Sequence, residues 1–267
     1  MNKILYTSIL GLMVTACSND NEPSINITSF AMTRVEHGMY EECTNLRSPV
    51  DSYVYPAYPG TIGWNEFQAK YGSIDAIVQA LLPTDEVASV LSTESLIYAY
   101  IDYPFGHGFQ ILQETIDREF DEFSICRELG NRDDAASTLI KIYEKFNIAG
   151  CEQGPVAHYP LLTLMSVECI HNQLNEQKTK ELVRMILDKW DLCKDINDNS
   201  FNFVQGNRLF VAFTIGRLMR DVEFVPMLDA LSKDALMTSF INEWHNPTEL
   251  KNGTIEQILN IANLFIK

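Results

Sequence analysis

Two stretches of the chain, YPLLTLMSVECI (residues 159–170) and LFVAFTIGRLM (residues 209–219), are apolar on nearly all sides. A helix that is hydrophobic all round belongs in the interior of a fold, because it has no polar face to turn toward water. We therefore expect two central helices here. A membrane span needs about 20 apolar residues. The first stretch is shorter and carries Glu168, so we expect no transmembrane helix in the body of the chain.

Amphipathic helices are predicted on both sides of these central segments. Apolar residues recur at spacings of three and four, which places them on one face of a helix. We read five such stripes, formed by Phe109, Leu112, Ile116, Phe120 and Phe123; Leu139, Ile142, Tyr143 and Phe146; Leu182, Ile186, Trp190 and Cys193; Leu236, Phe240, Ile241 and Trp244; and Ile255, Ile258, Leu259 and Ala262.

Helix starts can be placed from the side chains that cap them. Ser92 and Ser232 are predicted N-caps, Asp133-Asp134 suits a helix start, and Thr254 with Gln257 fits a capping box. Short polar links over residues 172–177 and 221–224 predict that successive helices run antiparallel.

The predicted fold class is all-α, built from stacked antiparallel helical hairpins with an extended N-terminal segment. The hairpins form either a short α-α superhelix or a compact helical bundle. We find no sequence repeat of fixed period, which weakens the superhelix alternative. A single all-helical domain is predicted over residues 64–267. Residues 31–63 form an extended Pro/Tyr-rich segment, because prolines 49, 56 and 59 exclude a central strand.

The start of the chain has the layout of an export signal. A positive start, Met1-Asn2-Lys3, precedes an apolar run over residues 4–14. The closing Val14-Thr15-Ala16-Cys17 resembles the lipobox of bacterial lipoproteins. The resemblance implies that residues 1–16 are removed, that Cys17 carries lipid, and that the protein is anchored at the outer membrane or cell surface. Residues 18–30 are polar at their start and are predicted to be a flexible tether.

The net charge limits the kinds of partner that the protein is expected to bind. The net charge is −16. Removing the signal takes away one lysine, so the mature chain keeps 19 Lys and Arg against 36 Asp and Glu, a net charge of −17. Such a balance argues against nucleic acid, and suits either a solvated acidic surface or a basic partner.

The spacing of the cysteines and histidines does not predict a metal site. Cys169 and His171 are two residues apart on one predicted helix, so their side chains point in different directions. The predicted hairpin brings Cys193 near Cys151 and His158. We therefore expect either a Cys151–Cys193 disulfide or small buried thiols at these positions, and no bound metal or cofactor.

A possible general base is His107, in the Gly-flanked loop that follows Asp102. Asp102 could orient its imidazole. The alternative is an interhelical turn with a solvated histidine. The sequence LSTESL (91–96) followed by Asp102-Tyr103-Pro104 is similar to a pattern in exported bacterial proteins of unassigned function; it implies no activity.

Aromatic side chains are the other candidate for a functional site, as a surface that binds a ligand. Tyr53, Tyr55, Tyr58 and Trp64 could stack on sugar rings if they are exposed, because a ring face is apolar. The alternative is that they pin the Pro-rich segment onto the helices.

The sequence contains no P-loop, G-x-G-x-x-G, G-x-S-x-G or H-E-x-x-H motif. The leading hypothesis is a lipid-anchored, non-enzymatic envelope protein that binds a glycan, peptide or protein partner. The alternatives are a hydrolase acting on an envelope or extracellular polymer, and an immunity-type lipoprotein whose acidic surface binds a basic partner.

Overall fold

The computed structural model describes residues 44–47, 49–58, 61, 63–104, 123–149, 154–193, 201–244, 250 and 252–267. These residues form helices and connecting segments, with no strand among them, so the predicted all-α class is confirmed. The helices are α3 (Trp64–Tyr71), α4 (Ile74–Leu81), α5 (Asp85–Val90), α6 (Thr93–Ile101), α8 (Ser124–Gly130), α9 (Ala135–Lys145), α10 (Gly154–Ser166), α11 (Glu168–His171), α12 (Glu176–Cys193), α13 (Phe201–Asp221), α14 (Val225–Lys233), α15 (Ala235–Glu243) and α16 (Asn252–Phe265).

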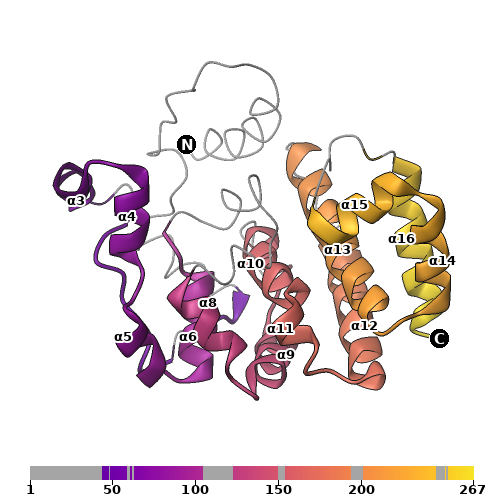
Figure 1. Cartoon of the computed structure of the whole chain (residues 1–267), viewed down its shortest axis with the longest axis horizontal. Coiled ribbons are helices and arrows are strands. Elements are labelled where there is room, and N and C mark those ends of the chain that lie inside the picture. The colour runs from indigo at the N-terminus through magenta and orange to yellow at the C-terminus, as the bar shows by residue number, and fades with distance from the viewer. Residues whose placement is uncertain are drawn as a thin grey trace.

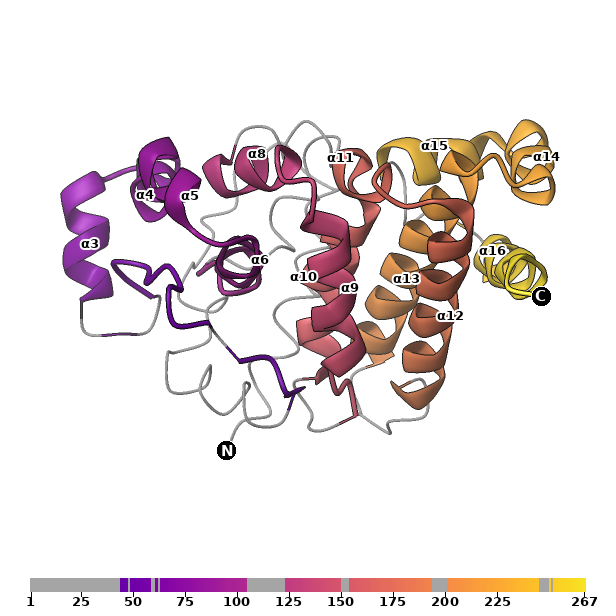
Figure 2. The same cartoon turned by 90° about the horizontal axis from the view of Figure 1, so that it is seen from below.

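The helices follow one another in chain order along the long axis of the molecule, from α3 at one end to α14 and α16 at the other (Figure 1). Helices α6, α10, α13 and α16 form a row in which each contacts the next (Figure 2). Helices α9 and α12 pack beside this row, on α10 and α13 respectively. This serial arrangement favours the superhelix over the compact bundle.

A unit of short helix, turn and longer helix recurs three times, as α5–α6, α8–α9 and α11–α12. Buried positions recur at two similar separations. The short helices bury Ala88, Leu129 and Ile170, which are 41 residues apart, and the longer helices bury Leu96, Leu139 and Leu182, which are 43 apart. These separations fall within the roughly 40–47 residues of helical solenoid repeats. The helical units therefore recur in the structure, although the sequence shows no repeat of fixed period.

Side-chain hydrogen bonds link one unit to the next at the same separation. Ser124 Oγ donates to the Pro83 carbonyl at 2.6 Å, and Thr93 Oγ1 donates to Asp134 Oδ1 at 2.6 Å. Gln173 Nε2 donates to the Arg132 carbonyl at 3.0 Å. Each pair is 41 residues apart. Because a polar group buried between repeats must be paired, these contacts fix how one unit sits on the next.

The two apolar stretches lie at the centre, as predicted. Helices α10 and α13 make the most extensive contact between described helices. The Tyr159 and Phe210 rings meet edge to face with centroids 4.8 Å apart. Thr214 Oγ1 donates to the Leu162 carbonyl at 3.1 Å, which satisfies a buried hydroxyl between the two helices. The first stretch is not one helix, because Val167 has extended backbone and separates α10 from α11.

Two predicted helix starts hold and two do not. Ser92 caps α6 by accepting the Ser95 N–H, and Asp134 is the N-cap of α9. Ser232 is not a cap, because α14 continues to Lys233. Asp234 caps α15 instead, since its carboxylate accepts two N–H groups while the Ser232 hydroxyl bonds back into α14. The capping box at Thr254 is also wrong, because α16 begins at Asn252.

Gly216 marks a close approach of α13 to α15. A Cβ added there would lie 2.3 Å from Cδ1 of the buried Ile241. We expect Gly216→Ala to lower the free energy of unfolding by about 1–3 kcal/mol, because a packed core resists extra volume. Urea unfolding measures this.

Gly253→Ala is the matched control, because Gly253 is also helical and has open space around its missing Cβ. It should be neutral or stabilising by up to about 1 kcal/mol. Equal effects of the two substitutions would contradict the close packing of α13 on α15.

Candidate functional site

Residues 49–58, here called the strap, form no helix or strand and pack on α6. Tyrosine hydroxyls hold the strap to backbone and side-chain acceptors. Tyr53 Oη donates to the Leu81 carbonyl at 3.0 Å and Tyr55 Oη donates to the Ala99 carbonyl at 2.6 Å. Tyr58 Oη donates to Asp102 Oδ2 at 3.0 Å. The strap is therefore part of the fold and covers the first repeat.

The tyrosines are more covered than a ligand-stacking platform requires. Tyr55 and Tyr58 are buried, Trp64 is only 1% exposed and stacks on Phe67, and Tyr53 is half-buried. A ring face covered by protein offers little area to a sugar. The arrangement therefore favours the alternative in which these aromatics pin the Pro-rich segment to the helices.

Of the proposed general base, His107, and the residue that would orient it, Asp102, the structure describes only Asp102. Asp102 lies at the C-terminal end of α6, where its carboxylate accepts the Tyr58 hydroxyl. His107 lies outside the described residues, as do Cys17 and Cys151, and for Cys193 only the backbone is described. The proposed roles of these four residues remain predictions.

Asp51 anchors the strap at the N-terminus of α6. Its carboxylate accepts the Ser92 N–H at 3.0 Å, the Ser92 hydroxyl at 3.2 Å and the Ser95 hydroxyl at 2.5 Å. Hydrogen bonds from Ser95 and Ser92 lower the pKa of Asp51 to about 2, because they stabilise the ionised carboxylate. This site is a fixed anion at neutral pH.

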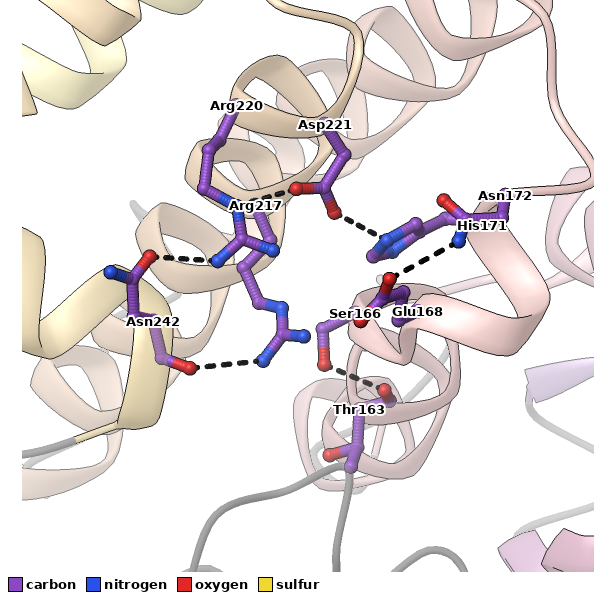
Figure 3. Close-up of polar contacts among 9 residues, drawn as sticks. All are labelled: Thr163, Ser166, Glu168, His171, Asn172, Arg217, Arg220, Asp221 and Asn242. Atoms are coloured by element: carbon purple, nitrogen blue, oxygen red, sulfur yellow. Dashed lines mark hydrogen bonds and ion pairs between the residues drawn. The ribbon is translucent and has the colours of Figure 1, made fainter.

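The richest polar cluster lies where α11, α13 and α15 meet (Figure 3). The His171 imidazole pairs with the Asp221 carboxylate, and Arg220 of α13 pairs with the same carboxylate. Arg220 Nη1 also donates to Asn242 Oδ1 at 2.8 Å. The cluster therefore ties α11 to α13 and α13 to the end of α15.

Arg217 lies one helical turn before this ion pair and is 1% exposed. Its Nη1 lies 3.4 Å from the Asn242 carbonyl oxygen, and its guanidinium lies 5.5 Å from the centre of the Phe213 ring. A guanidinium is tolerated inside a protein when it is paired and stacked in this way. Ser166 points toward this region, but its hydroxyl donates to the Thr163 carbonyl of its own helix at 2.7 Å.

The chemistry of the cluster is that of a structural junction. Burial raises the pKa of Asp221, but hydrogen bonds and charge from His171 and Arg220 outweigh burial and bring it to about 2. A general base works best with a pKa near the working pH. Asp221 is therefore suited to hold the His171 imidazole and the Arg220 guanidinium in place rather than to accept a proton.

The clustered cysteines and histidines face different neighbours. His158 is fully buried, and its Nε2 lies 2.6 Å from Tyr143 Oη. Cys169 packs on Gly130, whereas His171 pairs with Asp221. Among the residues that the structure describes, no three His, Cys, Asp or Glu side chains are grouped to hold a metal ion.

The chain was also compared with known proteins. No protein-family model, no curated protein and no solved structure gives a significant match. The functional argument therefore depends on this chain's own residues.

The polar junction can be tested by Asp221→Asn. Removing the carboxylate leaves the buried His171 and the Arg220 guanidinium without their shared anion, and we expect a loss of about 3 kcal/mol in the free energy of unfolding. The control is Asp229→Asn, which removes an exposed pair with Lys233 and should cost less than about 1 kcal/mol. Urea unfolding of both variants at pH 7 decides; equal losses would contradict a structural role for the junction.

The same junction predicts a pH dependence. The folded pKa of Asp221, about 2, lies below its usual 3.8, so the stabilisation is full above about pH 4 and is lost as the pH falls toward 2. Between pH 5 and pH 3, the stability difference between the wild type and Asp221→Asn should therefore fall by about half. A difference that does not change down to pH 3 would show that Asp221 is not the titrating group.

Proposed function

We propose that this chain is a lipid-anchored protein of the bacterial envelope whose helical array binds a partner protein. The observation that carries the anchoring is the run Val14-Thr15-Ala16-Cys17 behind an apolar segment and a positive start. Among the described residues, no helix is long and apolar enough to cross a membrane. Acyl chains on Cys17 would supply the anchor, since two or more chains hold a protein stably at a bilayer.

The serial fold supports binding. Stacked helical units expose long surfaces made from side chains of successive repeats, and such surfaces bind extended partners. In this chain the repeat α5–α6, α8–α9 and α11–α12 provides the units, and the strap packs on α6 of the first unit. A surface of this kind does not require a deep pocket.

The charge favours a basic protein or peptide over a glycan. The mature chain carries a net charge of −17, which attracts a cationic partner and speeds the encounter. The tyrosines that could have stacked on sugar rings are largely covered by the fold. The buried Asp221 junction is committed to ion pairs, so it adds no support to the hydrolase alternative.

Cys17→Ala tests the anchoring. In a Gram-negative host fed radiolabelled palmitate, the wild-type chain should take up label and sediment with membranes. The variant should lose all label, because the thioether-linked lipid needs the Cys17 sulfur.

Cys126→Ala is the matched control, because Cys126 is a buried cysteine inside the fold. It should label as the wild type does. Labelling of Cys17→Ala at the wild-type level would refute the proposed lipid anchor.

A further inference from the structure

A tight turn at the start of the strap presents Val50 to solvent. The Ser52 N–H donates to the Pro49 carbonyl at 3.1 Å, and the Ser52 hydroxyl donates to the same oxygen at 2.7 Å. Val50 lies at the tip of this turn and is fully exposed. An exposed valine is ordinary by itself; here its backbone is held by two hydrogen bonds.

Asp51 fixes the turn to the rest of the fold. The next residue after Val50 makes three hydrogen bonds to Ser92 and Ser95 at the N-terminus of α6. The apolar tip is therefore held in place before any partner arrives. Preorganisation of this kind reduces the entropy lost on binding.

Helix α5, which ends two residues before Ser92, carries two exposed valines. Val90 is 81% exposed and lies two residues before Ser92, which Asp51 contacts. Val87 is 40% exposed and lies one turn earlier, so it shares a face of α5 with Val90. Val50, Val87 and Val90 are here called the valine edge. The edge joins two segments that are about 40 residues apart in sequence and meet through Asp51 and Ser92.

Most charges next to the valine edge are acidic. The exception is Arg132, which donates to the Ser89 and Leu91 carbonyls on either side of Val90 and pairs with Glu128 at 2.6 Å. Asp51 lies within the turn, Glu86 lies one turn before Val90, and Glu94 lies in the first turn of α6; all three are exposed. The nearby guanidinium of Arg127 is taken up by Asp85 at 2.6 Å. A partner that covers the valines would therefore meet an excess of carboxylates.

We propose that the valine edge is a docking surface for a partner protein that presents an apolar segment flanked by lysine or arginine. This inference rests on the proposed binding function and names its surface. The valines supply apolar area, and Asp51, Glu86 and Glu94 favour cations at the rim. The exposed apolar residues at the opposite end of the array, Val225 and Leu228, lie instead beside an internally balanced pair, Asp229 with Lys233.

The test uses a synthetic amphipathic peptide of leucine and lysine, with a leucine and glutamate peptide of the same pattern as the charge control. Fluorescence anisotropy measures binding of each labelled peptide to the full chain in a non-ionic detergent, after subtraction of protein-free micelles. The variants are Val50→Ser with Val90→Ser, and Glu86→Lys. The matched control is Val225→Ser with Leu228→Ser, which removes exposed apolar area at the other end.

We expect the leucine and lysine peptide to bind the wild-type chain, and the glutamate peptide not to bind. The double valine variant and Glu86→Lys should each weaken binding about tenfold, because each removes part of a small contact. The Val225 and Leu228 control should bind as the wild type does. Absence of binding, or an equal loss of affinity in all three variants, would refute the proposal that the valine edge is a docking surface. Neither result would alter palmitate labelling at Cys17, so the anchor and the docking surface fail independently.

Discussion

The packing of α13 against α10 is the contact on which the rest of the structure depends. Residues 159–166 of α10 and 209–219 of α13 are apolar on nearly all sides, and Leu161, Leu162, Phe213 and Ile215 are essentially free of solvent. Burying one such side chain contributes about 1.5–3 kcal/mol. Neither helix can face water, so other helices must cover both. Helices α9 and α12 pack on one side, and α6 and α16 extend the row at its two ends (Figure 2).

Polar contacts hold the end of α13 and the strap over α6 in place. At the end of α13, Arg217, Arg220 and Asp221 turn an apolar helix into a junction that binds α11 and α15 (Figure 3). At the start of the array, the strap covers α6 with tyrosines and fixes its position through Asp51. A stack of repeats needs covered ends, because the last unit would otherwise expose its core. The strap packs over α6 of the first repeat.

The sequence predicted what depends on local pattern. The two central helices, the α6 cap at Ser92 and the all-α class follow from hydrophobic spacing and capping chemistry. The recurrence of helical units could not be predicted from the sequence, because only a few buried positions, such as Leu96, Leu139 and Leu182, keep their identity from unit to unit. The start of α15 was misplaced because Ser232 and Asp234 are both capping residues, and the carboxylate accepts two N–H groups where the serine accepts none.

The polar junction could not be predicted in the same way. His171 and Asp221 are 50 residues apart, and no periodic pattern brings them together. The signal available in the sequence was the presence of Arg217 and Arg220 at the end of an otherwise apolar helix, since a charge in such a place needs a partner. The partners are Asn242 on α15 and Asp221 on α13, and the fold also brings His171 of α11 to the same carboxylate. The functional proposal likewise combines a local motif at Cys17 with a surface that only the fold assembles.

Native-state hydrogen exchange tests the central packing most directly. If α10 and α13 are the core, their amide protons should exchange only through global unfolding, with protection equal to the free energy of unfolding from urea titration. Amides of α3 and α5, at one end of the array, should exchange through smaller openings. Fast exchange across residues 209–219, with slower exchange at the ends, would contradict the account.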